Sequence, residues 1–234
     1  MLMPRLRPNV NRGINSIKLY IGKALVFCEG TTEYNYLKYF IDIFKVNQKS
    51  KYTNIDIEVQ MENVHGNAQT VYKYAEEFLQ DEEHAKKYKD FDKFLIFDCD
   101  DPKNIVNVIK DMLDSPQQYK LLLTNLLFET WLLMHYETVD CEISKAQVYK
   151  RMSDYLGCLE YNSKEKANKG NIRKIIGDGQ SVKEAIRNAK NLENEYKDKC
   201  DDLVKNIGAL NPYTKVHSFI ERVLYEIDNM NQKN

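Results

Sequence analysis

The sequence has little of the two residues that most often interrupt regular structure. Glycine occurs 9 times and proline 5 times in 234 residues. This scarcity excludes a collagen-like or low-complexity chain, because such chains are rich in one or both. Hydrophobic residues make up 43% of the chain and charged residues 29%, which excludes a wholly disordered protein as well. The length suits one folded domain with an appendage better than two full domains.

Cysteine is also scarce, and long hydrophobic runs are lacking. The 5 cysteines are widely spaced and form no C-x-x-C pair, so neither a zinc site nor a redox motif is indicated. The most apolar stretch, 121–134, is broken by polar residues and is shorter than the roughly 20 residues that span a bilayer. The N-terminal segment contains arginines but no apolar signal region. These absences predict a cytoplasmic protein that does not contact the membrane.

No sign of charge predominates, since 34 Lys and Arg stand against 35 Asp and Glu. The distribution along the chain is nevertheless uneven. Residues 1–23 hold five bases and no acid, residues 76–114 hold twelve acids and six bases, and residues 161–190 hold eight bases and three acids. A nucleic-acid surface must therefore be local. Solvated helix faces and a loose terminus are the alternative explanation of these runs.

Apolar runs alternate with segments of helical periodicity over the first 139 residues. Strands are expected over 24–28, 55–61, 94–97 and 121–123, and helices over 31–46, 69–88, 103–113 and 126–136. Two or three of these strands are apolar on both faces. This alternation predicts an α/β fold with a mostly parallel sheet flanked by helices.

The pattern changes after about residue 139. Helices are expected over 144–156, 181–196 and 216–230, no strand is expected, and the polar segment 162–180 is expected to be a mobile loop. We therefore expect a basic N-terminal arm over 1–22, an α/β domain over 23–139 and a helical C-terminal region over 140–234.

Acidic residues follow two of the predicted buried strands. Glu29 comes after the first, and Asp98 and Asp100 come after the strand at 94–97. Ligands of open α/β sheets bind beyond the carboxyl ends of the strands, so we expect these acids to converge there. Clustered carboxylates repel one another unless a cation compensates, and Mg²⁺ prefers oxygen ligands. The pattern predicts a Mg²⁺ site, with Mn²⁺ as a substitute ion, suited to phosphodiester hydrolysis.

Each group of acids has a plainer explanation when it is taken alone. The run from Asp98 to Pro102 is typical of a helix N-terminus, where Asp caps the helix and proline fits its first turn. Glu29 would interact favourably with the dipole of the helix that follows it. The presence of acids after two separate strands favours a metal site over these explanations.

Four motifs, in order along the chain, resemble those of known families. Val26–Glu33 (VFCEGTTE) and Phe97–Asp100 (FDCD) resemble the TOPRIM pattern of topoisomerases, primases and OLD-type nucleases. Asn125–His135 (NLLFETWLLMH) and Asn211–His217 (NPYTKVH) resemble the RloB family of bacterial defence-associated proteins. The resemblance extends from about residue 22 to about residue 220. It departs from the family pattern after Asn125, where two leucines stand in place of proline and a small or polar residue.

The resemblance implies roles for the acids. Glu29 would hold a metal ion or transfer a proton, and Asp98 and Asp100 would be metal ligands with a part in catalysis. The auxiliary acids of the site would be Glu33, Asp101 and Glu129, the last of them in an F-E-x-W segment.

Basic residues and histidines are the candidates for contacts with substrate. By the same resemblance Lys215 would be a catalytic residue beside the scissile phosphate, with His217 near it, although the same segment also suits capping of the helix at 216–230. The segment 161–190 offers phosphate contacts through Lys166, Lys169, Arg173 and Lys174, and His65 offers another in a polar loop after the second strand. Without aromatic interleaving, this binding is expected to tolerate any sequence.

The leading prediction is a TOPRIM-type, Mg²⁺-dependent nuclease of DNA or RNA, transfer RNA included, that acts in antiviral defence or abortive infection. A receiver-like module that binds Mg²⁺ fits less well, because its acidic pair would follow the first strand. A HAD-type phosphatase also fits less well, because its D-x-D motif would lie where Glu29 lies. The third alternative is a non-catalytic metal-binding subunit beside a separate ATPase, since the chain has no Walker motif. A homo-oligomer remains open.

Overall fold

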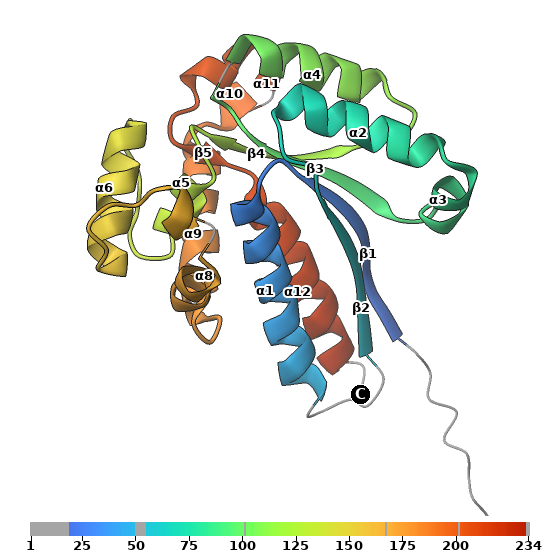
Figure 1. Cartoon of the computed structure of the whole chain (residues 1–234), viewed down its shortest axis with the longest axis horizontal. Helices are drawn as coiled ribbons and strands as arrows, with labels where there is room; N and C mark the ends of the chain where they lie inside the picture. The colour runs from blue at the N-terminus through green and yellow to red at the C-terminus, as the bar shows by residue number, and fades with distance from the viewer. Residues whose placement is uncertain (1–18, 50–54, 101, 167, 201, 233–234) are drawn as a thin grey trace, which may run out of the picture.

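The computed structural model describes residues 19–49, 55–100, 102–166, 168–200 and 202–232, which form a five-stranded sheet with helices on both faces (Figure 1). The strand order is β2-β1-β3-β4-β5. The strands are β1 (Leu19–Cys28), β2 (Ile55–Asn63), β3 (Asp92–Asp98), β4 (Lys120–Asn125) and β5 (Tyr213–Thr214). The first four are parallel and β5 is antiparallel to β4. This confirms the predicted α/β fold.

Side chains of β1 point alternately into two cores. Ala24 and Val26 belong to the core under α1 (Thr31–Lys49) and α12 (Val216–Gln232). Leu25 and Phe27 belong to the core under α2 (Ala68–Gln80) and α4 (Pro102–Asp114), on the opposite face in Figure 1. All four side chains are fully buried, because a parallel strand between two helix layers has no solvated face.

The remaining helices are short apart from two. They are α3 (Glu82–Lys87), α5 (Glu129–Leu133), α6 (Lys145–Leu156), α7 (Ser163–Lys166), α8 (Lys169–Ile176), α9 (Gln180–Glu195), α10 (Lys197–Cys200), α11 (Leu203–Asn206) and the 3-10 helix η1 (Ile207–Ala209). Ser144 begins α6 with a capping box that it forms with Gln147, and Gly157 ends the helix with φ 71°, a left-handed conformation that glycine adopts without strain. None of the described helices is long and apolar enough to cross a membrane.

Three expectations from sequence are corrected. The single helix expected over 69–88 is two helices, because the Asp81 side chain accepts backbone hydrogen bonds that start α3. The loop expected over 162–180 contains α7 and α8, and α8 buries Ile172, Ile175 and Ile176. The C-terminal region contributes a strand, β5, to the sheet. Residues 1–18 of the expected basic arm lie outside the described residues.

Candidate functional site

The carboxyl edge of the sheet brings the ends of β1 and β3 together. The backbone N–H of Glu29 donates to the carbonyl of Ile96 at 3.0 Å, which continues the pairing of the two strands by one residue. The N–H of Asp98 donates to Glu29 Oε2 at 3.1 Å. The Glu29 side chain therefore lies against the end of β3, as expected for acids that follow neighbouring parallel strands.

Two further carboxylates lie at this edge from different helices. Glu33 is in the first turn of α1 and is 6% exposed, and Glu129 is the first residue of α5 and is 2% exposed. A Cβ at residue 30 would lie 2.8 Å from Glu33 Oε2, so Gly30 leaves room for that carboxylate beside the turn. The helix N-termini favour negative charge at both acids.

Burial and the charges of neighbouring acids raise the pKa values of Glu29, Glu33 and Asp98. Burial, followed by the charges of Glu129 and Glu29, raises the pKa of Glu33 to about 8. The pKa of Asp98 lies well above its usual value, first because of burial and then because of Glu33, Glu129 and Glu29. Burial raises the pKa of Glu29 to about 7, against the lowering effect of the hydrogen bond from Asp98. Glu29, Glu33, Asp98 and Glu129 therefore act on one another electrostatically. We call these four residues the acidic cluster.

Lys166 supplies positive charge to the acidic cluster. Its Nζ lies 3.1 Å from Glu129 Oε1, and these side chains are 27% and 3% exposed. The same amine donates to Tyr149 Oη at 2.7 Å and lies 4.5 Å from the centre of that ring. Burial acts to lower the pKa of Lys166, but Glu129 and Tyr149 outweigh it and the pKa is raised. The structure thus directs Lys166, a predicted phosphate contact, toward a carboxylate.

Asp100 lies at the rim of the cluster. Its side chain is exposed, and Asp100 Oδ2 lies 3.6 Å from Nζ of Lys145, the first residue of α6. Asp100 acts to raise the pKa of Glu29 and Lys145 acts to lower it. Asp101, the remaining predicted acid, lies outside the described residues.

The donor chemistry of the acidic cluster fits a hard divalent cation, since every donor is a carboxylate oxygen. Carboxylates with raised pKa values hold protons near neutral pH, and a cation would replace those protons. Within the described ranges, however, no three His, Cys, Asp or Glu side chains converge closely enough to hold an ion. Glu129 instead forms an ion pair with Lys166.

A pocket of about 340 Å³ opens beside Asp100 at the same edge of the sheet. Asn125 and Asn211 contribute to its lining. Their side-chain nitrogens donate to the carbonyls of Ile207 and Ile143 at 3.1 and 3.0 Å. Their buried Oδ1 atoms have no hydrogen-bond partner among the described residues. The pocket is therefore polar and large enough for part of a ligand.

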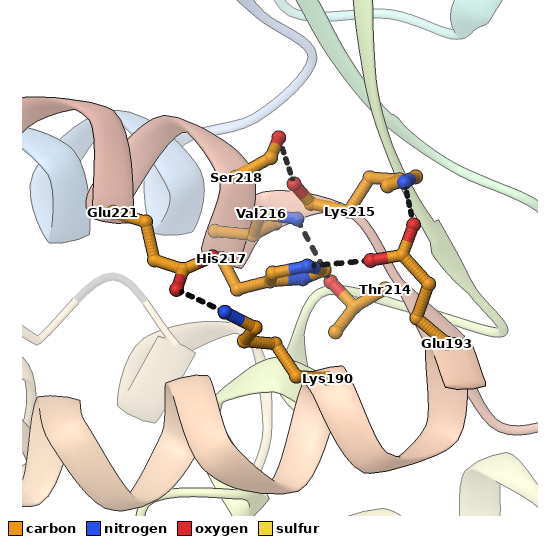
Figure 2. A network of polar contacts seen from close by, with 8 residues as sticks. All are labelled: Lys190, Glu193, Thr214, Lys215, Val216, His217, Ser218 and Glu221. Atoms are coloured by element: carbon orange, nitrogen blue, oxygen red, sulfur yellow. Dashed lines mark hydrogen bonds and ion pairs between the residues drawn. The ribbon is translucent and has the colours of Figure 1, made fainter. Parts of the chain in front are cut away.

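Lys215 and His217 bind a carboxylate away from this pocket (Figure 2). Lys215 Nζ forms an ion pair with Glu193 of α9, and His217 Nε2 lies 2.9 Å from the other oxygen of that carboxylate. Burial acts to raise the pKa of Glu193, but Lys215 and His217 outweigh it and the pKa is lowered. In Figure 2 a second ion pair, from Lys190 to Glu221 at 2.8 Å, runs beside the first. Both pairs join α9 to the segment that begins α12.

The other predicted substrate contacts are dispersed. Lys174 Nζ donates to the carbonyl of Leu156 at 2.8 Å. Lys169 and Arg173 are exposed and line a separate pocket between α1 and α8. His65 is exposed in the loop after β2, with φ 57°.

Residues that sequence reasoning missed are those whose importance depends on tertiary packing. Lys145 and Tyr149 lie in α6, which the periodicity does predict, but only the folded chain places them beside Asp100 and Lys166. His135, at the end of the Asn125–His135 segment, is 5% exposed. Its Nε2 lies 2.9 Å from Tyr36 Oη and its Nδ1 lies 3.0 Å from Ser181 Oγ.

Comparison with protein-family models settles the family. The model described as RloB-like protein matches residues 24–223, and this range contains the acidic cluster, Lys145, Lys166 and the contacts of Glu193. The chain belongs to the RloB-like protein family. Searches of curated proteins and of solved structures found no match.

Proposed function

We propose that this RloB-like protein is a TOPRIM-type, Mg²⁺-dependent nuclease that hydrolyses phosphodiester bonds of DNA or RNA in antiviral defence. The observation that carries the proposal is the acidic cluster at the carboxyl edge of a parallel sheet, where burial and the charges of neighbouring acids raise the pKa values of Glu29, Glu33 and Asp98. Such groups, perturbed by burial and by each other, are typical of functional sites rather than of surface ion pairs.

Glu29, Glu33 and Asp98 are the residues proposed to hold the ion. Bound Mg²⁺ would polarise a phosphoryl oxygen and lower the pKa of a bound water, and Mn²⁺ would substitute for it. Lys166 compensates the charge of Glu129 within the cluster, while Lys145 positions Asp100 at its rim. The pocket beside Asp100 is lined by Asn125 and Asn211, which would border a bound substrate.

Cleavage of labelled single-stranded and double-stranded DNA and RNA tests the proposal. We expect the wild type to cleave at least one of them in Mg²⁺ or Mn²⁺ and to lose activity in EDTA. Glu29→Gln and Asp98→Asn should each lower the rate by about 100-fold or more, the usual cost of removing a group that stabilises developing charge. Glu77→Gln and Asp114→Asn are matched controls, because both side chains are exposed on α2 and α4.

Equal rates for the wild type and Asp98→Asn in saturating Mg²⁺ would exclude this mechanism. A wild type that binds the ion but cleaves none of the substrates would favour the alternative, a metal-binding subunit that acts beside a separate ATPase.

A further inference from the structure

A second pocket, of about 140 Å³, lies between α1 and α8. Lys38, Tyr39 and Asp42 line it from α1, and Lys169 and Arg173 line it from α8. Three cations thus surround it with one acid, so its formal charge is positive. The two helices come from segments more than a hundred residues apart, and the periodicity of neither reveals the pocket.

The cations of this pocket are available to a ligand. Lys38, Lys169 and Arg173 are exposed. Of the ion pairs that the described residues form, none involves any of these three. This distinguishes them from Lys166, which binds Glu129, and from Lys174, which donates to a backbone carbonyl.

Tyr39 orients the arginine of the pocket. The guanidinium of Arg173 lies 5.7 Å from the centre of the Tyr39 ring, within the range of a cation–π contact. A guanidinium that is held in this way loses less entropy when it binds, and its planar fork matches two phosphate oxygens. The site therefore suits an anion that presents two oxygens to the guanidinium, such as a phosphate.

The pocket lies farther along α1 than the acidic cluster does. Glu33 is in the first turn of α1, and Lys38 and Tyr39 follow it on the same helix. At about 1.5 Å of rise per residue they lie roughly 7 to 9 Å along the axis from Glu33. A strand whose phosphates advance about 3.4 Å per nucleotide along a duplex axis covers that distance in two or three nucleotides.

We propose that this pocket binds a backbone phosphate of a nucleic-acid strand whose neighbouring nucleotides lie at the acidic cluster. The direction of the strand along α1 rests on the proposed function, but phosphate binding itself does not. Of the four basic residues of segment 161–190 predicted to contact nucleic acid, this assigns the contact to Lys169 and Arg173 and adds Lys38 from α1.

The test measures binding without cleavage. A short fluorescein-labelled oligothymidylate is titrated with protein in EDTA at several salt concentrations, and fluorescence anisotropy gives the affinity. We expect Arg173→Gln and Lys38→Gln each to weaken binding by about tenfold and to reduce the slope of log affinity against log salt by about 0.7, the value for one phosphate contact with a single strand. Lys183→Gln, which removes an equal charge from an exposed position on α9, should leave the slope unchanged.

Two results would overturn the proposal. One is a wild-type slope in both Arg173→Gln and Lys38→Gln, which would place the contact elsewhere. The other is displacement of the oligonucleotide by polyglutamate at an equal concentration of charge, which would show that the pocket recognises acidic peptides equally well. Because EDTA prevents metal-dependent cleavage, either result can occur while the nuclease proposal stands, and loss of cleavage in Glu29→Gln leaves this binding intact.

Discussion

A buried carboxylate needs a proton, a fixed cation or a metal ion to compensate its charge, and the acidic cluster uses more than one of these. The pKa of Glu33 is raised to about 8, so this acid keeps its proton near neutral pH. Glu129 instead has Lys166 at 3.1 Å. The lysine side chain crosses from α7 to α5, and its backbone carbonyl accepts a hydrogen bond from Thr32 Oγ1 at 3.5 Å. Lys166 therefore links α7 to the cluster as well as compensating its charge.

Lys166→Met should destabilise the protein by about 3 kcal/mol, because removing one partner of a buried ion pair leaves the other charge uncompensated. Urea unfolding near neutral pH measures this change. The double variant Lys166→Met/Glu129→Gln should recover most of the loss, since it removes the orphaned charge as well. Lys164→Met, in the same turn but exposed, should change stability by less than about 0.5 kcal/mol. Equal stabilities for Lys166→Met and Lys164→Met would show that the ion pair does not stabilise the fold.

His135 joins α1 and α9 through its contacts with Tyr36 and Ser181. The Ser181 hydroxyl donates to the carbonyl of Ile175 at 2.7 Å, so it accepts from His135 Nδ1–H. His135 Nε2 then accepts from the hydroxyl of Tyr36. Both ring nitrogens are satisfied only in this neutral tautomer, and burial lowers the pKa of His135 to about 3.

The contribution of this histidine to stability falls on mild acidification, whereas that of Glu29 and Glu33 rises. The unfolded chain takes up a proton below the usual pKa of about 6.5, whereas the folded chain does not, so the unfolded state binds more protons and gains stability as pH falls. Between about pH 7 and pH 5 the cost is about 2 kcal/mol, at 1.36 kcal/mol per pKa unit. His135→Gln should be less stable than the wild type at pH 7 but should lose about 2 kcal/mol less between the two values. Urea unfolding at both values measures the difference.

His65→Gln is the control for this comparison, because His65 is exposed in a loop. It should follow the wild type at both pH values. If stability changes by the same amount between the two pH values in His135→Gln and in the wild type, His135 does not contribute to the pH dependence.

The elements that sequence predicted best are those with enough residues to show a period. The four parallel strands and the helices α1, α4, α6, α9 and α12 all lie within a few residues of their predicted positions. In contrast, β5 is two residues long, too short to show alternation, and it forms because β4 supplies its partner. The helix α8 was missed because its three isoleucines lie among lysines, asparagines and glycines. Two of those glycines, Gly177 and Gly179, flank helices with positive φ rather than forming a loop.

For the whole molecule, the sequence predicted where acids would gather but not how their charge would be compensated. Glu29 and Asp98 could be placed at one edge because each follows a buried strand. Lys166 and Lys145 could not be assigned to Glu129 and Asp100, since those pairs depend on how α6 and α7 fold back over the sheet. Charge is almost balanced overall, at a net -1, yet the fold buries Glu33 and Glu129 and leaves Lys38, Lys169 and Arg173 exposed, outside the ion pairs that the described residues form.

This concentration of buried acid should limit the stability of the protein at alkaline pH. Acids with raised pKa values bind protons more tightly in the folded state than in the unfolded state. Their contribution to the free energy of unfolding is therefore fully present below their unfolded pKa values. It is lost as pH rises through about 7 to 8. Glu33→Gln removes one such charge while preserving shape. In EDTA at about pH 8 it should be more stable than the wild type by more than about 1 kcal/mol, with the advantage shrinking toward pH 5 as the wild-type acids take up protons. Urea unfolding across this range measures the difference, and the exposed Glu77→Gln should show none.

Addition of Mn²⁺ at pH 8 should stabilise the wild type more than Glu33→Gln, and an equal gain in both proteins would mean that Glu33 does not hold the ion.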